Sequence, residues 1–112
     1  MYEYNATVLR VYDGDTIRVD IDLGFGICLR DQPIRLLGID AAEARGKTKE
    51  QSIPARERLE DLLQRSGWKC TIRTRKNKER GKFGRILGEI FVKGEERSLN
   101  QVLLDEGLVE IY

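Results

Sequence analysis

Histidine is absent from the 112-residue sequence, so no histidine can act as a base, an acid or a metal ligand. This absence excludes Ser-His-Asp and Cys-His nucleophile systems and the His-Glu-x-x-His zinc site. Any chemistry must therefore be carried by carboxylates, guanidiniums, amines, hydroxyls or a bound metal ion.

Cysteine is scarce. The sequence has two cysteines, Cys28 and Cys70, and neither has a second cysteine nearby. This is not the spacing of a zinc site, and isolated thiols in apolar strands usually behave as small hydrophobic residues. We expect both thiols to be buried and expect no disulfide between them.

Long hydrophobic runs are also lacking. No stretch approaches the roughly 20 apolar residues of a membrane-spanning helix. The start, Met1–Tyr4, is neither basic nor apolar, so the sequence predicts no secretory signal and no membrane association, and it leaves the compartment open. With 40% hydrophobic and 35% charged residues, the chain is expected to form a single globular domain over residues 1–112.

The net charge of +1 hides an uneven distribution of charge. Residues 65–85 contain nine Lys or Arg and one acid, Glu79, so the rest of the chain is net acidic. Such a segment is either a solvated charged hairpin or a surface that binds a polyanion, and its composition alone does not decide between them.

The first part of the sequence predicts three successive strands, over residues 4–12, 15–23 and 27–39. Asp13-Gly14 is a turn signal between the first two. The second strand alternates apolar and polar residues, with Ile17, Val19, Ile21 and Leu23 on its apolar face. We expect the third strand to be interrupted near Pro33, which cannot donate to a ladder.

A helix is predicted next, with Ser52 as its N-cap, Pro54 in its first turn and Ser66-Gly67 at its end. Its apolar stripe comprises Ile53, Leu59, Leu62 and Leu63.

The remainder predicts strands at 68–74 and 85–93 and a short helix between a Ser98/Gln101 capping box and Gly107. Residues 108–112 can add a last strand. This order predicts a mainly β fold, a small, partly open five-stranded barrel of the oligonucleotide/oligosaccharide-binding (OB) type. One helix lies between strands three and four and a second near the C-terminus.

Acidic and basic residues gather around the expected strand ends. Asp15 is not needed by the Asp13-Gly14 turn, and Arg35 lies in an apolar run where a buried guanidinium needs a partner. Taken singly, each motif has an ordinary explanation as a hairpin or loop. Together, Asp15 and Asp40 are hard oxygen ligands for Ca²⁺ or Mg²⁺, and Glu43 is a candidate general base. Arg35 and Arg85 can grip a phosphate, so the combination indicates metal-assisted phosphoryl chemistry.

The segments "VYDGDTIRV", "IRLLGIDAAE" and "KFGR", in this order and separation, resemble the staphylococcal nuclease (thermonuclease) family. The resemblance extends from about Ala6 to Leu108 and includes the "LNQVLLDEGL" segment. It implies the OB-type barrel and hydrolysis of DNA and RNA with Ca²⁺ as cofactor.

The resemblance also implies roles for single residues. It implies that Asp15, Asp40 and the main-chain carbonyl of Ala41 hold the metal ion. It implies Glu43 as the general base, or as a group that orients the water, and Arg35 and Arg85 as the phosphate-binding arginines. Lys82 and Phe83, with the basic segment 69–82, are expected to guide a single strand, and Tyr112 to supply a stacking ring.

The sequence departs from the family pattern in three places. Ala42 replaces a proline, which should loosen the loop that aims Glu43 and lower the rate. Phe83 stands where a tyrosine is common; it can stack on a base but cannot donate to a phosphate. The sequence ends at Tyr112, without the C-terminal helix of the best-known members.

The sequence thus predicts a Ca²⁺-dependent nuclease acting on DNA, RNA or both, on single-stranded or frayed substrate, and as a monomer. The alternative is a non-catalytic nucleic-acid- or protein-binding module on the same barrel. A third interpretation is a fragment that needs a partner chain. The sequence does not distinguish DNA from RNA, or cleavage at ends from cleavage in interiors.

Overall fold

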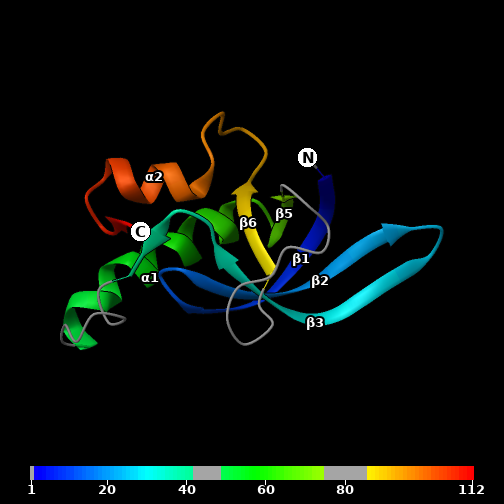
Figure 1. Cartoon of the computed structure of the whole chain (residues 1–112), viewed down its shortest axis with the longest axis horizontal. Coiled ribbons are helices and arrows are strands. Elements are labelled where there is room, and N and C mark those ends of the chain that lie inside the picture. Colours follow the sequence, from blue (N-terminus) through cyan, green and yellow to red (C-terminus); the bar gives the residue numbers. More distant parts are fainter. Residues whose placement is uncertain (1, 42–48, 75–85) are drawn as a thin grey trace.

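The computed structural model describes residues 2–41, 49–74 and 86–112, without the side chains of 49–52 (Figure 1). Seven strands and two helices lie in these ranges. The strands are β1 (Tyr2–Asp13), β2 (Thr16–Gly24), β3 (Ile27–Leu36), β4 (Ile39–Asp40), β5 (Lys69–Thr74), β6 (Ile86–Phe91) and β7 (Glu110–Ile111). The helices are α1 (Lys49–Arg65) and α2 (Leu99–Asp105). Neither helix of this described part is long and apolar enough to cross a bilayer.

Five strands form a barrel in the order β1-β2-β3-β6-β5, and this barrel is closed rather than partly open. Closure depends on two pairings between strands that lie far apart in the sequence. β1 pairs antiparallel with β5, and β3 pairs parallel with β6 through three residue pairs that begin at Ile34↔Ile86. The predicted fold class, a five-stranded OB-type barrel with a helix between its third and fourth strands, is confirmed.

The barrel interior is filled by the apolar face of each strand. On β2, Ile17, Val19 and Ile21 are almost completely buried, as the alternating pattern predicts. α1 packs against β1 with Ala55, Leu59 and Leu63 facing the core. Truncating one such buried leucine or isoleucine to alanine typically costs about 2–5 kcal/mol.

The start of α1 differs from the prediction. The helix begins at Lys49, so Ser52 lies inside it rather than at the N-cap, and Pro54 lies in the second turn. A proline there removes a single intrahelical hydrogen bond close to the helix start, which the helix tolerates. The C-terminal end is as predicted, with Gly67 in the left-handed region at φ 70°.

α2 begins at the predicted cap. The Ser98 hydroxyl accepts the Gln101 backbone N–H at 3.0 Å, but the Gln101 side chain donates to Asp105 at 2.6 Å. Only the Ser98 half of the expected capping box is therefore formed, because the Gln101 side chain points along the helix instead of back to the cap. After α2 the chain adds β7, which pairs with β4 as a separate two-stranded sheet.

Three details of the β2–β3 region correct the prediction. The third strand is continuous through Pro33, which lies opposite Arg18, and the break falls instead at Gly38, where φ is 82°. Leu23 is 39% exposed, and Cys28 is exposed. Both lie where the hairpin projects beyond the barrel, so no core is present to cover them (Figure 1). Cys70 is buried, and both thiols are free, as predicted.

Candidate metal and phosphate site

Asp15 is held at the start of β2 by a tight turn. The Asp13 side chain accepts the Asp15 backbone N–H at 3.0 Å, which is the local hydrogen bond that aspartate commonly makes in turns. The Asp15 carbonyl accepts the backbone N–H of Leu36 at 2.8 Å, so the turn is fixed to the end of β3. Behind it, a Cβ added to Gly14 would lie only 2.6 Å from the Ala55 Cβ of α1. The Asp13–Asp15 turn therefore sits directly against the helix.

Arg35 lies near the end of β3, opposite Thr16, and is only 9% exposed. Its Nη1 donates to the Leu36 carbonyl at 3.0 Å. Its Nη2 lies 3.5 Å from Asp15 Oδ2 and 3.4 Å from Asp40 Oδ1. The buried guanidinium that looked anomalous in an apolar run is thus paired with two buried carboxylates, which offsets its desolvation.

Asp40 and Ala41 are brought to this point by the small β4–β7 sheet. Asp40 pairs with Glu110 in that sheet and is 4% exposed. The Ala41 backbone N–H donates to Asp15 Oδ2 at 2.7 Å. This hydrogen bond ties the end of β4 to the start of β2, across 26 residues of sequence.

The Asp15 carboxylate is strongly perturbed. Its pKa is raised to about 6, mainly because burial disfavours the charged form, and next because of the hydrogen bond with the Asp13 side chain. The Ala41 N–H and the Arg35 charge act in the opposite direction. The Thr16 hydroxyl lies 3.0 Å from the other oxygen, Oδ1.

The donor atoms fit a hard divalent cation. Asp15 Oδ2 and Asp40 Oδ1 come from separate strands and converge on the same atom of Arg35. Among the described residues, two buried carboxylates face this one guanidinium, and carboxylate oxygens are ligands that Ca²⁺ and Mg²⁺ take. Within the described ranges, no group of three acidic, histidine or cysteine side chains is placed so that it could hold a metal ion. The third expected carboxylate, Glu43, lies outside those ranges.

Tyr112 lies beside this group. The Arg35 guanidinium carbon is 5.4 Å from the centroid of the Tyr112 ring, within the range of a cation–π contact. The Tyr112 backbone N–H donates to the Gly38 carbonyl at 3.0 Å, which extends the β4–β7 pairing. The ring is nevertheless exposed, because Tyr112 as a whole is 70% accessible.

The structure therefore brings together Asp15, Arg35, Asp40, Ala41 and Tyr112. The other expected site residues, Glu43, Lys82, Phe83 and Arg85, and the departure at Ala42, lie outside the described residues.

Two further described residues belong to the basic segment, and both already have partners on the barrel surface. The Lys69 amine donates to the Thr7 hydroxyl at 3.0 Å. Arg73 pairs with Glu3 at 2.8 Å and lies over the Phe91 ring.

Two residues of the site were missed by sequence reasoning. Asp13 and Thr16 flank Asp15 and bond to it directly. Both stand in the "DGDT" segment, but only Asp15 was assigned to the site, because Asp13 was interpreted as part of the turn and Thr16 as an ordinary strand residue.

A family model described as staphylococcal nuclease homologue matches residues 33–112. The matched region contains Arg35, Asp40, Ala41 and Tyr112, whereas Asp15 precedes it. No curated protein matches the chain. Since the matched residues make up most of the sequence, the chain belongs to the staphylococcal nuclease homologue family.

Proposed function

We propose that this chain is a Ca²⁺-dependent nuclease that hydrolyses phosphodiester bonds in DNA, RNA or both. The observation that carries the proposal is the convergence of Asp15, Asp40 and Arg35, from three strand ends, in one largely buried cluster. Burying two carboxylates and one guanidinium costs desolvation free energy. Well-packed apolar residues of similar size would stabilise the fold at least as well. Family membership makes a nuclease-related role the natural reason for keeping the cluster.

Asp15 and Asp40, with the main-chain carbonyl of Ala41, are the residues that would hold Ca²⁺. A bound Ca²⁺ would supply Lewis-acid stabilisation of the phosphate and a site for the attacking water. Asp15 is already oriented for this role, because the N–H of Ala41 fixes its Oδ2 at 2.7 Å and Thr16 contacts its Oδ1.

Arg35 would stabilise the negative charge that builds on the phosphate oxygens during attack. One of its nitrogens is anchored to the Leu36 carbonyl and another lies between the two carboxylates, so the fork is oriented before substrate arrives. Preorganised donors in a water-poor site are worth far more than the same donors in bulk water. By the resemblance, Arg85 is the second arginine of this kind, and Glu43 takes a proton from the attacking water or orients it.

The exposed Tyr112 ring supports a nucleic-acid substrate with accessible bases. It lies next to Arg35, so a base stacked on the ring would place its phosphate near the guanidinium. Lys82, Phe83 and the basic segment 69–82 would add charge and a second stacking ring. A single-stranded or frayed substrate suits this arrangement better than an intact duplex.

A digestion assay on plasmid and single-stranded oligonucleotides, with Ca²⁺ or with a chelator, tests the proposal. We expect cleavage by the parent only with the metal ion. We expect a loss of at least about 100-fold for Arg35→Ala, the scale for removing one charge-stabilising donor. Glu43→Gln should also lose activity. Arg30→Ala is the matched control, because the Arg30 side chain is 80% exposed and lies on the β2–β3 hairpin.

Equal cleavage by parent, Arg35→Ala and Glu43→Gln would reject the proposed site. Absence of cleavage by the parent, together with oligonucleotide binding by fluorescence anisotropy, would favour the non-catalytic binding module. Metal binding is read separately, by thermal unfolding. Ca²⁺ should raise the unfolding temperature of the parent but not that of Asp40→Asn, because a ligand stabilises only the state that binds it.

A further inference from the structure

The pairing of β1 with β2 is irregular near the end of β1. Its register shifts between Val8 and Arg10 and again at Tyr12. Val8 and Val11 are both buried, so the first shift turns Arg10 to the outside of the barrel. Strict alternation from Val8 would turn this arginine inward. Bulges of this kind commonly re-aim side chains next to active sites, and here they make Arg10 and Tyr12 exposed.

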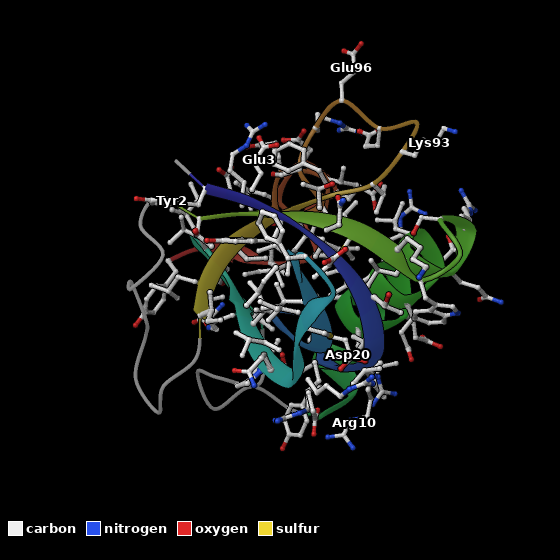
Figure 2. The ribbon with its side chains drawn as sticks, turned by 90° about the vertical axis from the view of Figure 1, so that its right-hand side faces the viewer. Tyr2, Glu3, Arg10, Asp20, Lys93 and Glu96 are labelled. Carbon is white, nitrogen blue, oxygen red and sulfur yellow. The ribbon has the colours of Figure 1, made fainter. Side chains whose placement is uncertain are left out.

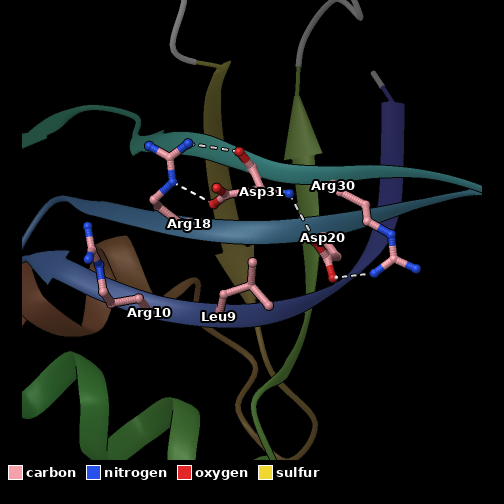
Figure 3. A pocket seen from close by; sticks show the side chains of 6 residues that line it. All are labelled: Leu9, Arg10, Arg18, Asp20, Arg30 and Asp31. Atoms are coloured by element: carbon pink, nitrogen blue, oxygen red, sulfur yellow. Dashed lines mark hydrogen bonds and ion pairs between the residues drawn. The ribbon is translucent and has the colours of Figure 1, made fainter.

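The register shift also places Arg10 directly opposite Arg18 of β2. Directly opposite residues of an antiparallel pair have Cβ atoms about 4.5–5.5 Å apart, and like charges at these positions repel one another. Arg18 has an acidic partner, since its Nε lies 2.6 Å from Asp31 Oδ1. The Arg10 guanidinium makes no ion pair with any residue of the described ranges (Figure 3). Two neighbouring guanidiniums with one acid between them favour a bound anion.

Arg18 is already oriented on this outer face. Its Nε donates to Asp31 Oδ1 at 2.6 Å and its Nη2 donates to the Asp31 carbonyl at 2.8 Å. Asp31 is in turn fixed to β2, because its backbone N–H donates to Asp20 at 2.9 Å. The third nitrogen, Nη1, makes no hydrogen bond within the described part of the chain. A guanidinium held by two of its nitrogens loses little conformational freedom when the third binds a ligand oxygen.

Both arginines line an open hollow of about 640 Å³ on the outside of β1, β2 and β3 (Figure 3). Its charged lining residues are Arg10, Arg18, Asp20, Arg30 and Asp31. Arg30 pairs with Asp20 at 3.6 Å, as Arg18 pairs with Asp31. Arg10 therefore supplies the charge by which three cations exceed two anions. A planar guanidinium in such a hollow suits a phosphate or a carboxylate, which it can bind through two parallel hydrogen bonds.

An exposed aromatic ring beside Arg10 decides between these anions. The Arg10 guanidinium carbon is 5.7 Å from the centroid of the Tyr12 ring, and Tyr12 is 61% exposed. A nucleotide of a single strand can use both groups, because its base stacks on the ring while its phosphate binds the arginine. An inorganic anion or a carboxylate would gain nothing from the ring. The pair of side chains therefore fits a single-stranded nucleic acid.

The same face leads to the proposed metal and phosphate site. Tyr12 is separated from Asp15 by Asp13 and Gly14 alone. Arg18 follows Asp15 by three residues, a span of about 10 Å along an extended strand. An OB-type barrel contacts about 4–16 nucleotides of a single strand, which is more than the buried cluster around Asp15 could contact. A strand bound at that cluster can thus reach the outer face of β1 and β2.

We propose that Arg10, Arg18 and Tyr12 form a second contact surface for a single-stranded nucleic acid, outside the metal and phosphate site. The two guanidiniums bind one backbone phosphate, and the Tyr12 ring stacks on a neighbouring base. This surface rests on the proposed function, because it extends the path of the same substrate along the outside of β1 and β2. It takes no part in the chemistry, and it needs no metal ion to bind.

Fluorescence anisotropy with a labelled single strand of about 12 nucleotides, measured in chelator, tests the proposal. Arg10→Gln should raise the dissociation constant about fivefold at about 0.1 M salt. It should also reduce the slope of log affinity against log salt concentration by about 0.7, the value for one phosphate contact. Tyr12→Leu should raise the dissociation constant at least about fivefold without changing the slope, since stacking releases no counterion.

Lys93→Ala is the matched control for the loss of one positive charge. Lys93 is exposed and lies at the opposite end of the molecule from Arg10 (Figure 2), so this variant should bind as the parent does. Arg10→Glu separates binding from folding. It places a carboxylate opposite Arg18, so the unfolding temperature should stay level or rise, while the affinity falls further than in Arg10→Gln.

Oligonucleotide binding that both Arg10 variants leave unchanged, or an unchanged salt slope for Arg10→Gln, would overturn the proposal. Binding of the parent to phosphatidylserine vesicles that Arg10→Gln abolishes, with oligonucleotide binding intact, would also overturn it and assign the surface to a membrane. Cleavage is read independently. A parent that binds through Arg10 but does not cleave keeps this surface and loses the proposed activity. A parent that cleaves while its binding is indifferent to Arg10 keeps the activity and loses this surface.

Discussion

The guanidinium of Arg35 and the ring of Tyr112 lie 5.4 Å apart, although one ends a barrel strand and the other follows β7. The β4–β7 sheet makes this contact possible, because it places Tyr112 beside Gly38, just beyond β3. Figure 2 shows how far apart other surface side chains lie. Arg10 of β1 and Asp20 of β2 are at the opposite end of the view from Lys93 and Glu96, which lie between β6 and α2. Arg35 thus contacts two carboxylates and an aromatic ring.

The contact between the Tyr112 ring and Arg35 predicts a small stabilisation of the fold that depends on the aromatic ring. Tyr112→Ala should lower the free energy of unfolding by about 0.5–1 kcal/mol, the scale of an exposed cation–π contact. Tyr112→Phe keeps an aromatic face over Arg35 and should retain most of that free energy. Urea unfolding of the three proteins measures the difference. Equal losses for the Ala and Phe variants would show that the ring itself does not stabilise Arg35.

The close approach of Gly14 to Ala55 predicts steric coupling between the Asp15 turn and α1. Gly14→Ala would place a Cβ 2.6 Å from the Ala55 Cβ and should destabilise the fold by about 1–3 kcal/mol. Ala55→Gly alone should cost about 1 kcal/mol through helix propensity. The double variant should be less destabilised than the sum of the single ones, by about 1 kcal/mol or more in a double-mutant cycle. Simple additivity would contradict a direct clash.

Local sequence patterns predicted the positions of helices and strands better than they predicted which strands pair with one another. The alternation along β2 identified its buried face, and Ser98 was recognised as a cap because both signals act within a few residues. The parallel pairing of β3 with β6, which closes the barrel, leaves no local trace. Leu23 was expected on the buried face but is exposed. The alternation along a strand does not show where the strand leaves the barrel.

The candidate site was predictable from chemistry more than from pattern. Arg35 in an apolar run demanded a buried acid, and the structure places Asp15 and Asp40 beside it. The bond from Ala41 to Asp15 could not be anticipated, because it depends on how β4 is oriented after the turn at Gly38. Burial of Asn100 was missed altogether, since a polar residue in a short helix looks exposed.

The hydrogen bonds of the Asn100 side chain predict a large loss of stability when its amide is removed. Its side chain donates to the carbonyls of Leu37 and Gly88, at 2.8 and 3.2 Å, and accepts the Ile90 N–H at 3.1 Å. Asn100→Ala would leave the Leu37 carbonyl and the Ile90 N–H unpaired, so we expect a loss of about 2–4 kcal/mol in unfolding free energy. The neighbouring Gln101→Ala, at an exposed position, should cost less than about 1 kcal/mol. Similar losses for both variants would contradict the buried network.

The two thiols should differ sharply in reactivity. Burial raises the pKa of Cys70 to about 12, so almost none of its thiolate exists near neutral pH, whereas Cys28 is exposed on the β2–β3 hairpin. Titration with a disulfide reagent at pH 8 should modify one thiol per native chain rapidly, and the second only after unfolding. Cys28→Ser should abolish the rapid phase. Rapid reaction of both thiols in the native parent would mean that β5 opens readily.

Arg58 links the two helices, because its Nε and Nη2 bind both oxygens of Glu106 at 2.9 and 3.0 Å. The Arg58 hydrogen bonds lower the pKa of Glu106 below its usual value. A lowered carboxyl pKa stabilises the fold above the unfolded pKa of about 4.3, and this contribution is lost as pH falls through the folded value.

Arg58→Met should therefore cost about 0.5–1 kcal/mol at pH 7, and the difference from the parent should shrink below about pH 4. Arg56→Met is the matched control on the same helix, since Arg56 approaches Glu60 only to 3.9 Å and both side chains are 44% exposed. It should cost less at every pH. A gap between Arg58→Met and the parent that persists unchanged in acid would assign the effect to packing of the arginine stem on α2 rather than to its charge.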